Sequence, residues 1–327
     1  MIAFIIRRLF QSVIVMGVVA FVAFSLFQFV GDPVLAMVGQ DTTPEQRAEL
    51  RRDLGLDESI PVQFAHFVSQ AVQGDFGMSY RQSRKVSTLL KERFPATMEL
   101  SIVAAGLALV VGIPMGVYTA LRRKGWLANL LLATSLIGVS LPTFLIGILL
   151  ILVFAVILGW LPSFGRGQTV SLGWWSTGLL GRDGWAHIVL PAITLALFQT
   201  TLIMRLVRAE MLEVLRTDYI KFARARGLSD RAVYFGHALR NTLVPVITIT
   251  GLQLGAIIAF AIITETVFQW PGMGLLFIQS VQVADIPIMA AYLCLIALIF
   301  VTINLVVDLL YFVVDPRLRV ERAGSSH

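Results

Sequence analysis

Six long apolar stretches constrain the fold of this chain more than any other feature. A helix needs about 20 apolar residues to cross the roughly 30 Å hydrocarbon core of a bilayer. The stretches that reach or approach this length are Leu9–Val30, Thr97–Leu121, Leu127–Leu158, Ile188–Val207, Leu243–Ile263 and Ile286–Val314. We therefore expect an all-α, polytopic membrane protein with six transmembrane helices.

The third stretch is long enough to form two segments. It contains Pro142, but no charged residue lies between Lys124 and Arg166. A hairpin buried without a polar turn is unfavourable, whereas a proline can kink a continuous helix. The sequence thus predicts one long helix over Leu127–Leu158, kinked near Pro142.

The composition excludes a soluble globular enzyme. The chain is 57% hydrophobic and 14% charged, with a mean hydropathy of +0.81, whereas soluble domains carry about 25% charged residues. The net charge is +6. The basic residues flank the apolar stretches and form no patch on a soluble domain, so no nucleic-acid partner is expected. The single cysteine, Cys294, rules out an intrachain disulfide and is interpreted as a packing residue.

The basic residues predict the orientation in the membrane. Most of the 26 lysines and arginines lie near the N-terminus, at 122–124, in 205–240 and in the C-terminal tail. The loop 159–187 carries only Arg166 and Arg182. Because cytoplasmic loops are enriched in basic residues, we expect both termini in the cytoplasm.

We divide the chain into four parts. The first helix, 1–30, is longer than the apolar region of a signal peptide and is expected to be retained. An outer helical region, 31–95, precedes a transmembrane core, 96–314, with a cytoplasmic loop at 208–243. A tail, 315–327, completes the chain.

Two helices are expected in the outer region. Thr43-Pro44-Glu45 begins one that runs to Leu54-Gly55, and a second ends at Gly74. They pack on the outer mouth of the bundle or lie on the membrane surface.

In the loop 159–187, four tryptophans are interpreted as interfacial anchors, with substrate contact as the alternative: Trp160, Trp174, Trp175 and Trp185.

No motif for intrinsic catalysis is present. A P-loop requires Gly-Lys followed by Ser or Thr, and none of the four lysines follows a glycine. The four histidines are scattered and no His-Glu-x-x-His occurs, so no catalytic residue, metal site or cofactor is expected.

Among carboxylates within spans, Glu99 and Asp308 are interpreted as helix-end or helix–helix contacts. Glu265 and Pro142 are our candidates for a translocation path.

A polar, basic segment, Tyr219–Ile247, interrupts the apolar pattern. Apolar residues at helical spacing predict one helix that ends at Gly227: Met211, Leu215, Tyr219 and Phe222. Ser229-Asp230 should cap a second helix over 231–240, and Pro245 should lie in the first turn of the next span. The first helix inserts into a groove of a partner protein or lies against anionic headgroups.

This segment resembles the cytoplasmic loop of ABC importer permeases, in which EAA is followed by three residues, Gly, nine residues and I-x-L-P. Aligned on Gly227, the residues Ala223 and Leu239 match, whereas four positions depart from the pattern: Lys221, Phe222, His237 and Arg240. Further ordered motifs follow the dipeptide/oligopeptide/nickel branch along the chain, including RRLFQSV, GDFGMSY, MLEVLRTDYI, ARARGLS, HALRNTLVPVIT and ITETVFQWPGMG.

The resemblance implies a first-type permease with the type I ABC importer fold in a bacterial inner membrane. Its implied partners are a second homologous permease, two ATPase subunits and a periplasmic or lipid-anchored substrate-binding protein, besides membrane lipid. ATP would be hydrolysed in the ATPase subunits, and this chain would need no cofactor. The implied coupling residues are Tyr219, Lys221, Phe222, Ala223, Arg224, Arg226 and Gly227.

The transported substrate is left open by the sequence. Within this branch, di- or oligopeptides are the expected cargo, and nickel chelates, glutathione, opines and some sugars are the alternatives. Two other classes of function remain as hypotheses, namely a self-sufficient channel or secondary carrier and a membrane enzyme.

Overall fold

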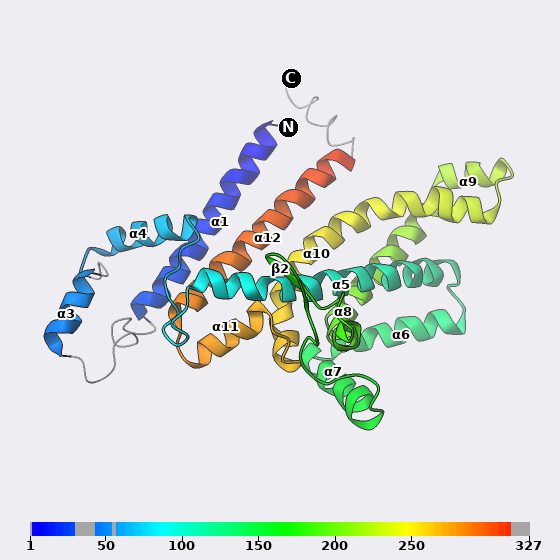
Figure 1. Cartoon of the computed structure of the whole chain (residues 1–327). Helices are drawn as coiled ribbons and strands as arrows, with labels where there is room; N and C mark the ends of the chain where they lie inside the picture. Colours follow the sequence, from blue (N-terminus) through cyan, green and yellow to red (C-terminus); the bar gives the residue numbers. More distant parts are fainter. Residues whose placement is uncertain (1, 30–42, 54–56, 315–327) are drawn as a thin grey trace, which may run out of the picture. The chain divides into compact units, whose positions relative to one another are not determined.

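The computed structural model describes residues 2–29, 43–53 and 57–314, which are mostly helical. The tail 315–327 and the predicted end of the first outer helix at Leu54-Gly55 lie outside these residues. The elements are α1 (Ile2–Phe29), α3 (Pro44–Asp53), α4 (Ile60–Val72), α5 (Val86–Leu121), α6 (Trp126–Ser140), α7 (Thr143–Leu150), the π-helix η1 (Ile151–Ile157), β1 (Val170–Leu172), β2 (Trp175–Thr177), α8 (Gly184–Val214), α9 (Asp218–Ala225), the π-helix η2 (Ala232–Ala238), α10 (Leu239–Val267), α11 (Met273–Gln282) and α12 (Ile286–Val314) (Figure 1).

The chain forms two compact units. The first comprises 1–97, 170–177 and 271–302. The second comprises 98–169, 178–270 and 303–327.

Within the described residues, five helices are long and apolar enough to cross a membrane. They are Ile5–Phe29, Val86–Leu121, Gly184–Val214, Pro245–Val267 and Ile286–Leu309. A bent pair of helices follows α5: the first is α6, and the second consists of α7 continued by η1. Counted together as one span, this pair is the sixth. The expectation of six apolar spans is therefore confirmed in number only when this pair is taken together.

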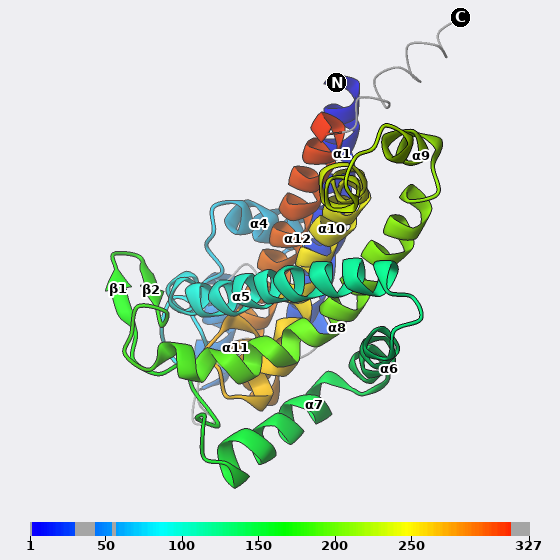
Figure 2. The same ribbon diagram turned by 90° about the vertical axis from the view of Figure 1, so that its right-hand side faces the viewer.

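The expected single kinked helix in the third stretch is wrong. The helix α6 ends at Ser140, and the next helix begins at Thr143 with a bend of 110° (Figure 2). Proline disfavours a helical conformation in the residue before it, which here is Leu141. Pro142 itself has φ −57° and ψ 137°, and its carbonyl accepts the N–H groups of Leu145 and Ile146. The proline therefore starts a new helix.

The first unit contains the two predicted outer helices. Thr43 and Gln46 exchange hydrogen bonds between backbone N–H and side-chain oxygen at 3.3 and 3.4 Å, a capping box at the start of α3. The helix α4 ends before Gly74, at φ +72°. It packs on α1 through phenylalanine pairs with ring centroids 5.5 to 6.0 Å apart: Phe21–Phe64, Phe24–Phe64, Phe24–Phe67 and Phe27–Phe67.

Two further features of this unit bear on the sequence predictions. Cys294 is buried beside Ala23 and Ala290, which confirms its packing role. The strands β1 and β2 pair antiparallel as a short hairpin, with Gly173 at φ +74° in the turn. The described residues are otherwise mostly helical, so the expected helical fold class is confirmed. Three-residue strands are too short to leave an alternating pattern in the sequence.

The second unit is built around α8, which neighbouring helices approach at glycines. A Cβ at Gly116 of α5 would lie 2.6 Å from Val207 Cβ, and one at Gly112 would lie 3.1 Å from the Thr200 carbonyl oxygen. One at Gly138 of α6 would lie 2.8 Å from Thr201 Oγ1. Small residues spaced four apart allow transmembrane helices to approach closely, because apolar burial alone contributes little within lipid.

The substitution Gly116→Val tests this packing. The added side chain overlaps Val207, so we expect the protein to lose about 1–3 kcal/mol of stability. Thermal denaturation of the detergent-solubilised protein measures the change. Gly106→Val is the matched control in the same helix, because Gly106 is exposed and has no heavy atom within 4 Å of the added Cβ position. Equal stability of the two variants would contradict the close approach of α5 to α8.

Candidate functional site

The helix α9 is a separate short element, so the single helix expected from Met211 to Phe222 is wrong. The preceding helix α8 ends at Val214, and Thr217 is extended, with ψ 154°. The Thr217 hydroxyl donates to the Val214 carbonyl at 2.6 Å, which satisfies a terminal acceptor of α8. Threonine favours such local bonds over a helix interior, and helical spacing alone does not reveal this break.

The two faces of α9 differ sharply. Ile220 is fully buried and Ala223 is nearly so, and α9 packs against η2. On the other face, the side chain of Phe222 is 64% exposed and that of Tyr219 is 40% exposed. The sequence singled out both aromatic residues but missed Ile220, which anchors the helix. The pair Ile220 and Ala223, three residues apart, is the signal that would have identified the buried face.

Polar contacts fix the exposed residues of α9. The Asn241 amide donates to the Tyr219 hydroxyl oxygen at 2.6 Å, which links α9 to α10. Lys221 pairs with Asp218 at 2.8 Å, and this hydrogen bond lowers the pKa of Asp218 below its usual value. Two guanidiniums lie over aromatic rings, with Arg226 5.9 Å from the Phe222 centroid and Arg224 5.8 Å from the Tyr234 centroid.

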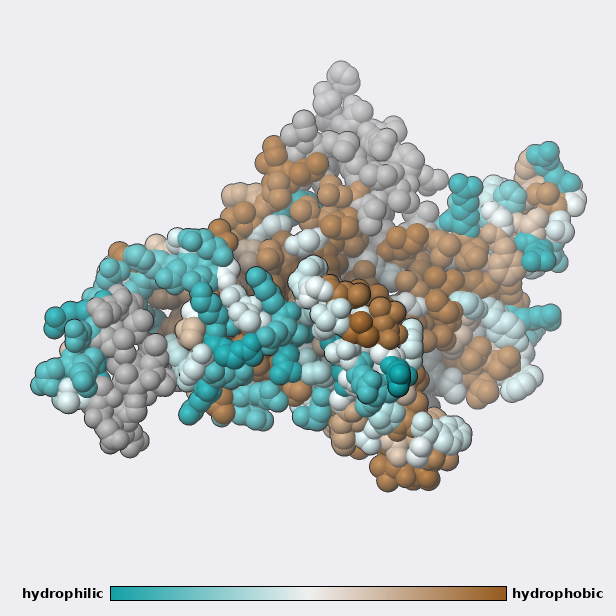
Figure 3. Space-filling model, in the orientation of Figure 1, coloured by the Kyte–Doolittle hydropathy of each residue, from teal (hydrophilic) through white to brown (hydrophobic). Residues whose placement is uncertain are grey.

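Gly227 ends α9 as predicted. It has φ +78°, its N–H donates to the Arg224 carbonyl, and the Leu228 N–H donates to the Ala223 carbonyl. These two bonds form a Schellman motif, in which a residue with left-handed conformation follows the helix. Figure 3 shows hydrophilic residues gathered at α9 and apolar surface along α10.

Ser229 caps the next helix as predicted, because its hydroxyl accepts the Ala232 N–H at 3.4 Å. The helix does not stop near Arg240, however. It continues through η2 and α10 to Val267, so Pro245 lies inside a helix and the expected position in a first turn is wrong. Membrane helices tolerate internal proline because neighbouring groups can satisfy the freed carbonyl.

The two candidates for a translocation path lie in different surroundings. Glu265, in the last turn of α10, is fully buried. Pro142 is exposed at the break between α6 and α7. The structure therefore does not place both residues on one exposed surface.

The sequence missed a buried ion pair at Glu99. This carboxylate lies inside α5, because the helix starts at Val86 and not at Thr97 as expected. It pairs with Arg166, and it accepts the Gly178 N–H at 3.1 Å. The side chains of Glu99 and Arg166 are 3% and 5% exposed, and Arg166 lies 5.9 Å from the Trp270 ring centroid. Glu99 thus binds the loop 159–187 and is not a helix-end contact. The other carboxylate interpreted in this way, Asp308, is half-buried in α12.

The same loop is held at the start of α8. The Gln168 N–H donates to Asp183 Oδ1 at 2.8 Å, and this bond lowers the pKa of Asp183. His187 contacts the Phe164 carbonyl at 3.0 Å through Nδ1. Gly167 lies between them at φ +71°, where a Cβ would be 2.7 Å from the His187 ring. Among the described residues, no three His, Cys, Asp or Glu side chains are grouped to hold a metal ion.

The substitution Glu99→Gln tests the buried pair. It leaves the Arg166 charge buried without a carboxylate, so we expect a loss of about 3–5 kcal/mol of stability. Thermal denaturation of the solubilised protein measures it, and the double variant Glu99→Leu/Arg166→Met should recover most of the loss. Arg84→Gln is the matched control, because the Arg84–Glu92 pair is about half exposed and should contribute nothing measurable. A Glu99→Gln variant as stable as Arg84→Gln would refute this role.

Comparisons with known proteins identify the class of protein. Residues 112–320 match the family described as binding-protein-dependent transport system inner membrane component, and residues 1–101 match the N-terminal region described for such membrane components. The glutathione transport system permease protein GsiC of Escherichia coli (strain K12) is 36% identical over 320 residues, covering 98% of this chain and 99% of that protein.

Two further relatives agree. The dipeptide transport system permease protein DppB of Alkalihalophilus pseudofirmus is 35% identical over 332 residues, covering 98% of this chain and all of that protein. An inward-facing structure of the MetNI methionine ABC transporter shares the fold, with a TM-score of 0.56 and 20% identity over 69% of this chain and 96% of that chain. The chain therefore belongs to the binding-protein-dependent transport system inner membrane components, as an ABC importer permease of the dipeptide/oligopeptide branch.

Proposed function

We propose that α9 receives the movement of an ATPase subunit and that the importer carries di- or oligopeptides. As a permease of this family, the chain is a multi-pass inner-membrane transport subunit, and ATP is hydrolysed in partner subunits. The observation that carries the proposal for α9 is Phe222, an aromatic side chain 64% exposed on a helix whose opposite face is buried.

An exposed aromatic residue beside an arginine is a suitable contact for a partner protein. Aromatic residues and arginine dominate the binding energy of protein interfaces. Arg226 lies over the Phe222 ring, and Tyr219 contributes further apolar surface on the same helix. A groove on an ATPase subunit that accepts Phe222 would bury the largest exposed apolar group of α9.

The other face of α9 supports transmission of a movement. Ile220 and Ala223 are buried where α9 packs on η2, and the Asn241–Tyr219 hydrogen bond joins α9 to α10. A displacement of α9 therefore reaches a helix that includes the candidate span Pro245–Val267. Because packed helices move as rigid bodies, such a displacement favours one of two states of the bundle.

The proposed assembly contains a second homologous permease, two ATPase subunits and a periplasmic or lipid-anchored binding protein. The basic residues at α9 and at both ends of the chain support a cytoplasmic location for α9 and the termini. The permease itself performs no chemical step and needs no cofactor. It opens alternately to each side of the membrane as the ATPase pair closes and opens.

The relatives support peptide cargo. DppB is named for dipeptides, and GsiC for glutathione, which is itself a small peptide. Glutathione is thus the second candidate within the same chemical class. Nickel chelates and opines would require a binding protein of a different kind. A self-sufficient channel or secondary carrier would transport solute without ATP or partners.

The substitution Phe222→Asp tests the coupling role of α9. A carboxylate in the partner's apolar groove should reduce ATP-driven uptake about tenfold or more, while the protein still inserts into the membrane. Uptake of labelled dipeptide into proteoliposomes that contain the whole importer measures the effect. Phe222→Leu keeps the apolar contact and should retain most of the uptake. Normal uptake by the Asp variant would refute the proposal.

Gly227→Val extends this test to the end of α9. The left-handed conformation costs a residue with a Cβ about 1–2 kcal/mol, and the cost is higher for a β-branched residue such as valine. We therefore expect the angle between α9 and η2 to change and uptake to fall. Gly236→Ala is the matched control, because Gly236 has ordinary helical φ and no heavy atom within 4 Å of the added Cβ position. An equal effect of both substitutions would argue against the role of the Schellman motif.

The cargo is tested by competition. Cells that express the whole importer should accumulate labelled dipeptide, and unlabelled peptides should reduce this uptake. Unlabelled glutathione that competes at similar concentration would indicate a broader peptide site. Uptake of a nickel chelate without uptake of any peptide would contradict the proposed substrate class.

A further inference from the structure

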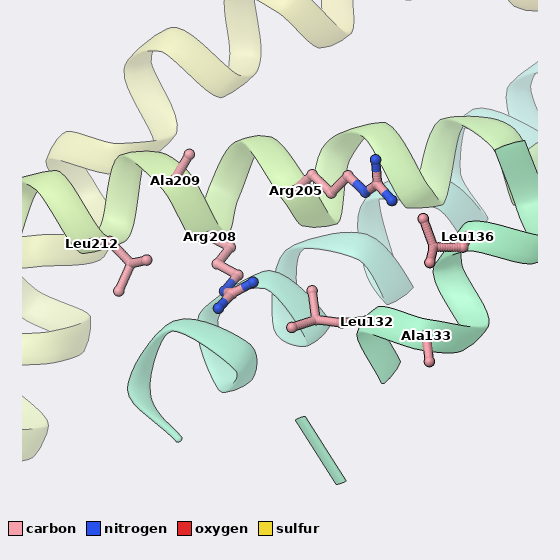
Figure 4. A pocket seen from close by; sticks show the side chains of 7 residues that line it. All are labelled: Leu132, Ala133, Leu136, Arg205, Arg208, Ala209 and Leu212. Carbon is pink, nitrogen blue, oxygen red and sulfur yellow. The ribbon is translucent and has the colours of Figure 1, made fainter. Parts of the chain in front are cut away.

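A cavity of about 580 Å³ lies between α6 and α8 in the second unit. It is lined by Leu132, Ala133 and Leu136 of α6 and by Arg205, Arg208, Ala209 and Leu212 of α8 (Figure 4). Neither the proposed coupling contact nor the Glu99 ion pair uses these residues. Five of the seven lining residues are leucine or alanine, and the other two are arginines.

The two arginines carry positive charge that no described residue compensates at the cavity. No acidic residue lines it, and within the described residues neither guanidinium has an ion-pair partner. Arg205 is exposed, whereas Arg208 is half-buried with a buried Nε that has no hydrogen-bond partner. A buried polar donor without a partner is costly, so the site favours an anionic acceptor.

The arginines lie at the depth of lipid headgroups. The span α8 begins at Gly184, next to the 58% exposed Trp185, which is suited to one membrane interface. At 1.5 Å per residue, Arg205 is roughly 30 Å along the helix from Gly184. This length equals the thickness of the hydrocarbon core, so Arg205 and Arg208 reach the opposite interface.

We propose that this cavity binds the phosphate headgroup of an anionic phospholipid. The two guanidiniums would hold the phosphate oxygens, because arginine matches phosphate geometry with paired N–H donors. Leu132 and Leu136 of α6 and Leu212 of α8 would contact the glycerol and the start of the acyl chains. Basic pockets between membrane helices on the cytoplasmic side bind anionic lipids in this way.

The lining favours lipid over the transported peptide. A peptide carries amide groups that require hydrogen-bonding partners, and apart from the two arginines the lining side chains offer none. A phospholipid combines an anionic group with hydrocarbon, which corresponds to two arginines beside leucines. A lipid bound here would also hold α6 against α8, close to the contact between Gly138 and Thr201.

The proposal is tested on the assembled importer with phosphatidylglycerol as the probe and phosphatidylcholine as the neutral competitor. Native mass spectrometry of the solubilised complex counts the phosphatidylglycerol retained. In the double variant Arg205→Gln/Arg208→Gln we expect its affinity to fall roughly 30-fold relative to wild type. The matched control Arg122→Gln/Arg123→Gln removes the same charge from exposed positions outside the cavity and should retain the lipid.

A second variant keeps the test decisive if the arginine variant fails to assemble. Leu136→Trp fills the cavity without changing any charge, and it should also lose the bound phosphatidylglycerol. Retention equal to wild type in either cavity variant would overturn the proposal. If retention in the arginine variant is unchanged and its half-saturating peptide concentration is also raised, the cavity is a substrate subsite instead. Because lipid retention is measured without transport, this outcome is independent of the role of α9.

Discussion

The close approach of helices to α8 is the constraint on which the second unit depends. Lipid is as apolar as the side chains it surrounds, so these helices associate through contact and hydrogen bonds. Gly112 and Gly116 bring α5 to α8, and Gly138 does the same for α6. The Thr201 hydroxyl also contacts the Ser135 carbonyl at 3.1 Å, a polar contact that only such proximity allows. The result is one helix held on several sides.

This central helix joins the loop 159–187 to the proposed coupling helix α9. Its first residues hold the loop 159–187 through Asp183 and His187, and its last turn leads through Thr217 into α9. Glycines permit the tight packing along its length, whereas local side-chain bonds set its two ends.

Sequence reasoning succeeded where one physical effect dominates. Apolar length located the spans, and Gly227 located the end of α9 because left-handed backbone strongly favours glycine. It failed where two effects compete. Pro142 breaks the third stretch although apolar length favours continuity, whereas Pro245 is accommodated inside a helix. Likewise, nothing in the spacing of Glu99 and Arg166 shows that α5 and a distant loop bring them together.

The arginines show how surroundings assign different roles to one residue type. Arg166 is buried and paired with the Glu99 carboxylate, so an opposite charge from α5 holds its guanidinium inside the second unit. Arg224 and Arg226 lie over aromatic rings on the surface, where the guanidinium adds to an apolar contact and stays hydrated. Among the described residues, Arg205 and Arg208 have neither a carboxylate partner nor a stacked ring, and they line a cavity beside leucines. A positive charge that the protein does not neutralise there attracts an anion from outside the chain, and the membrane supplies phosphate at that depth.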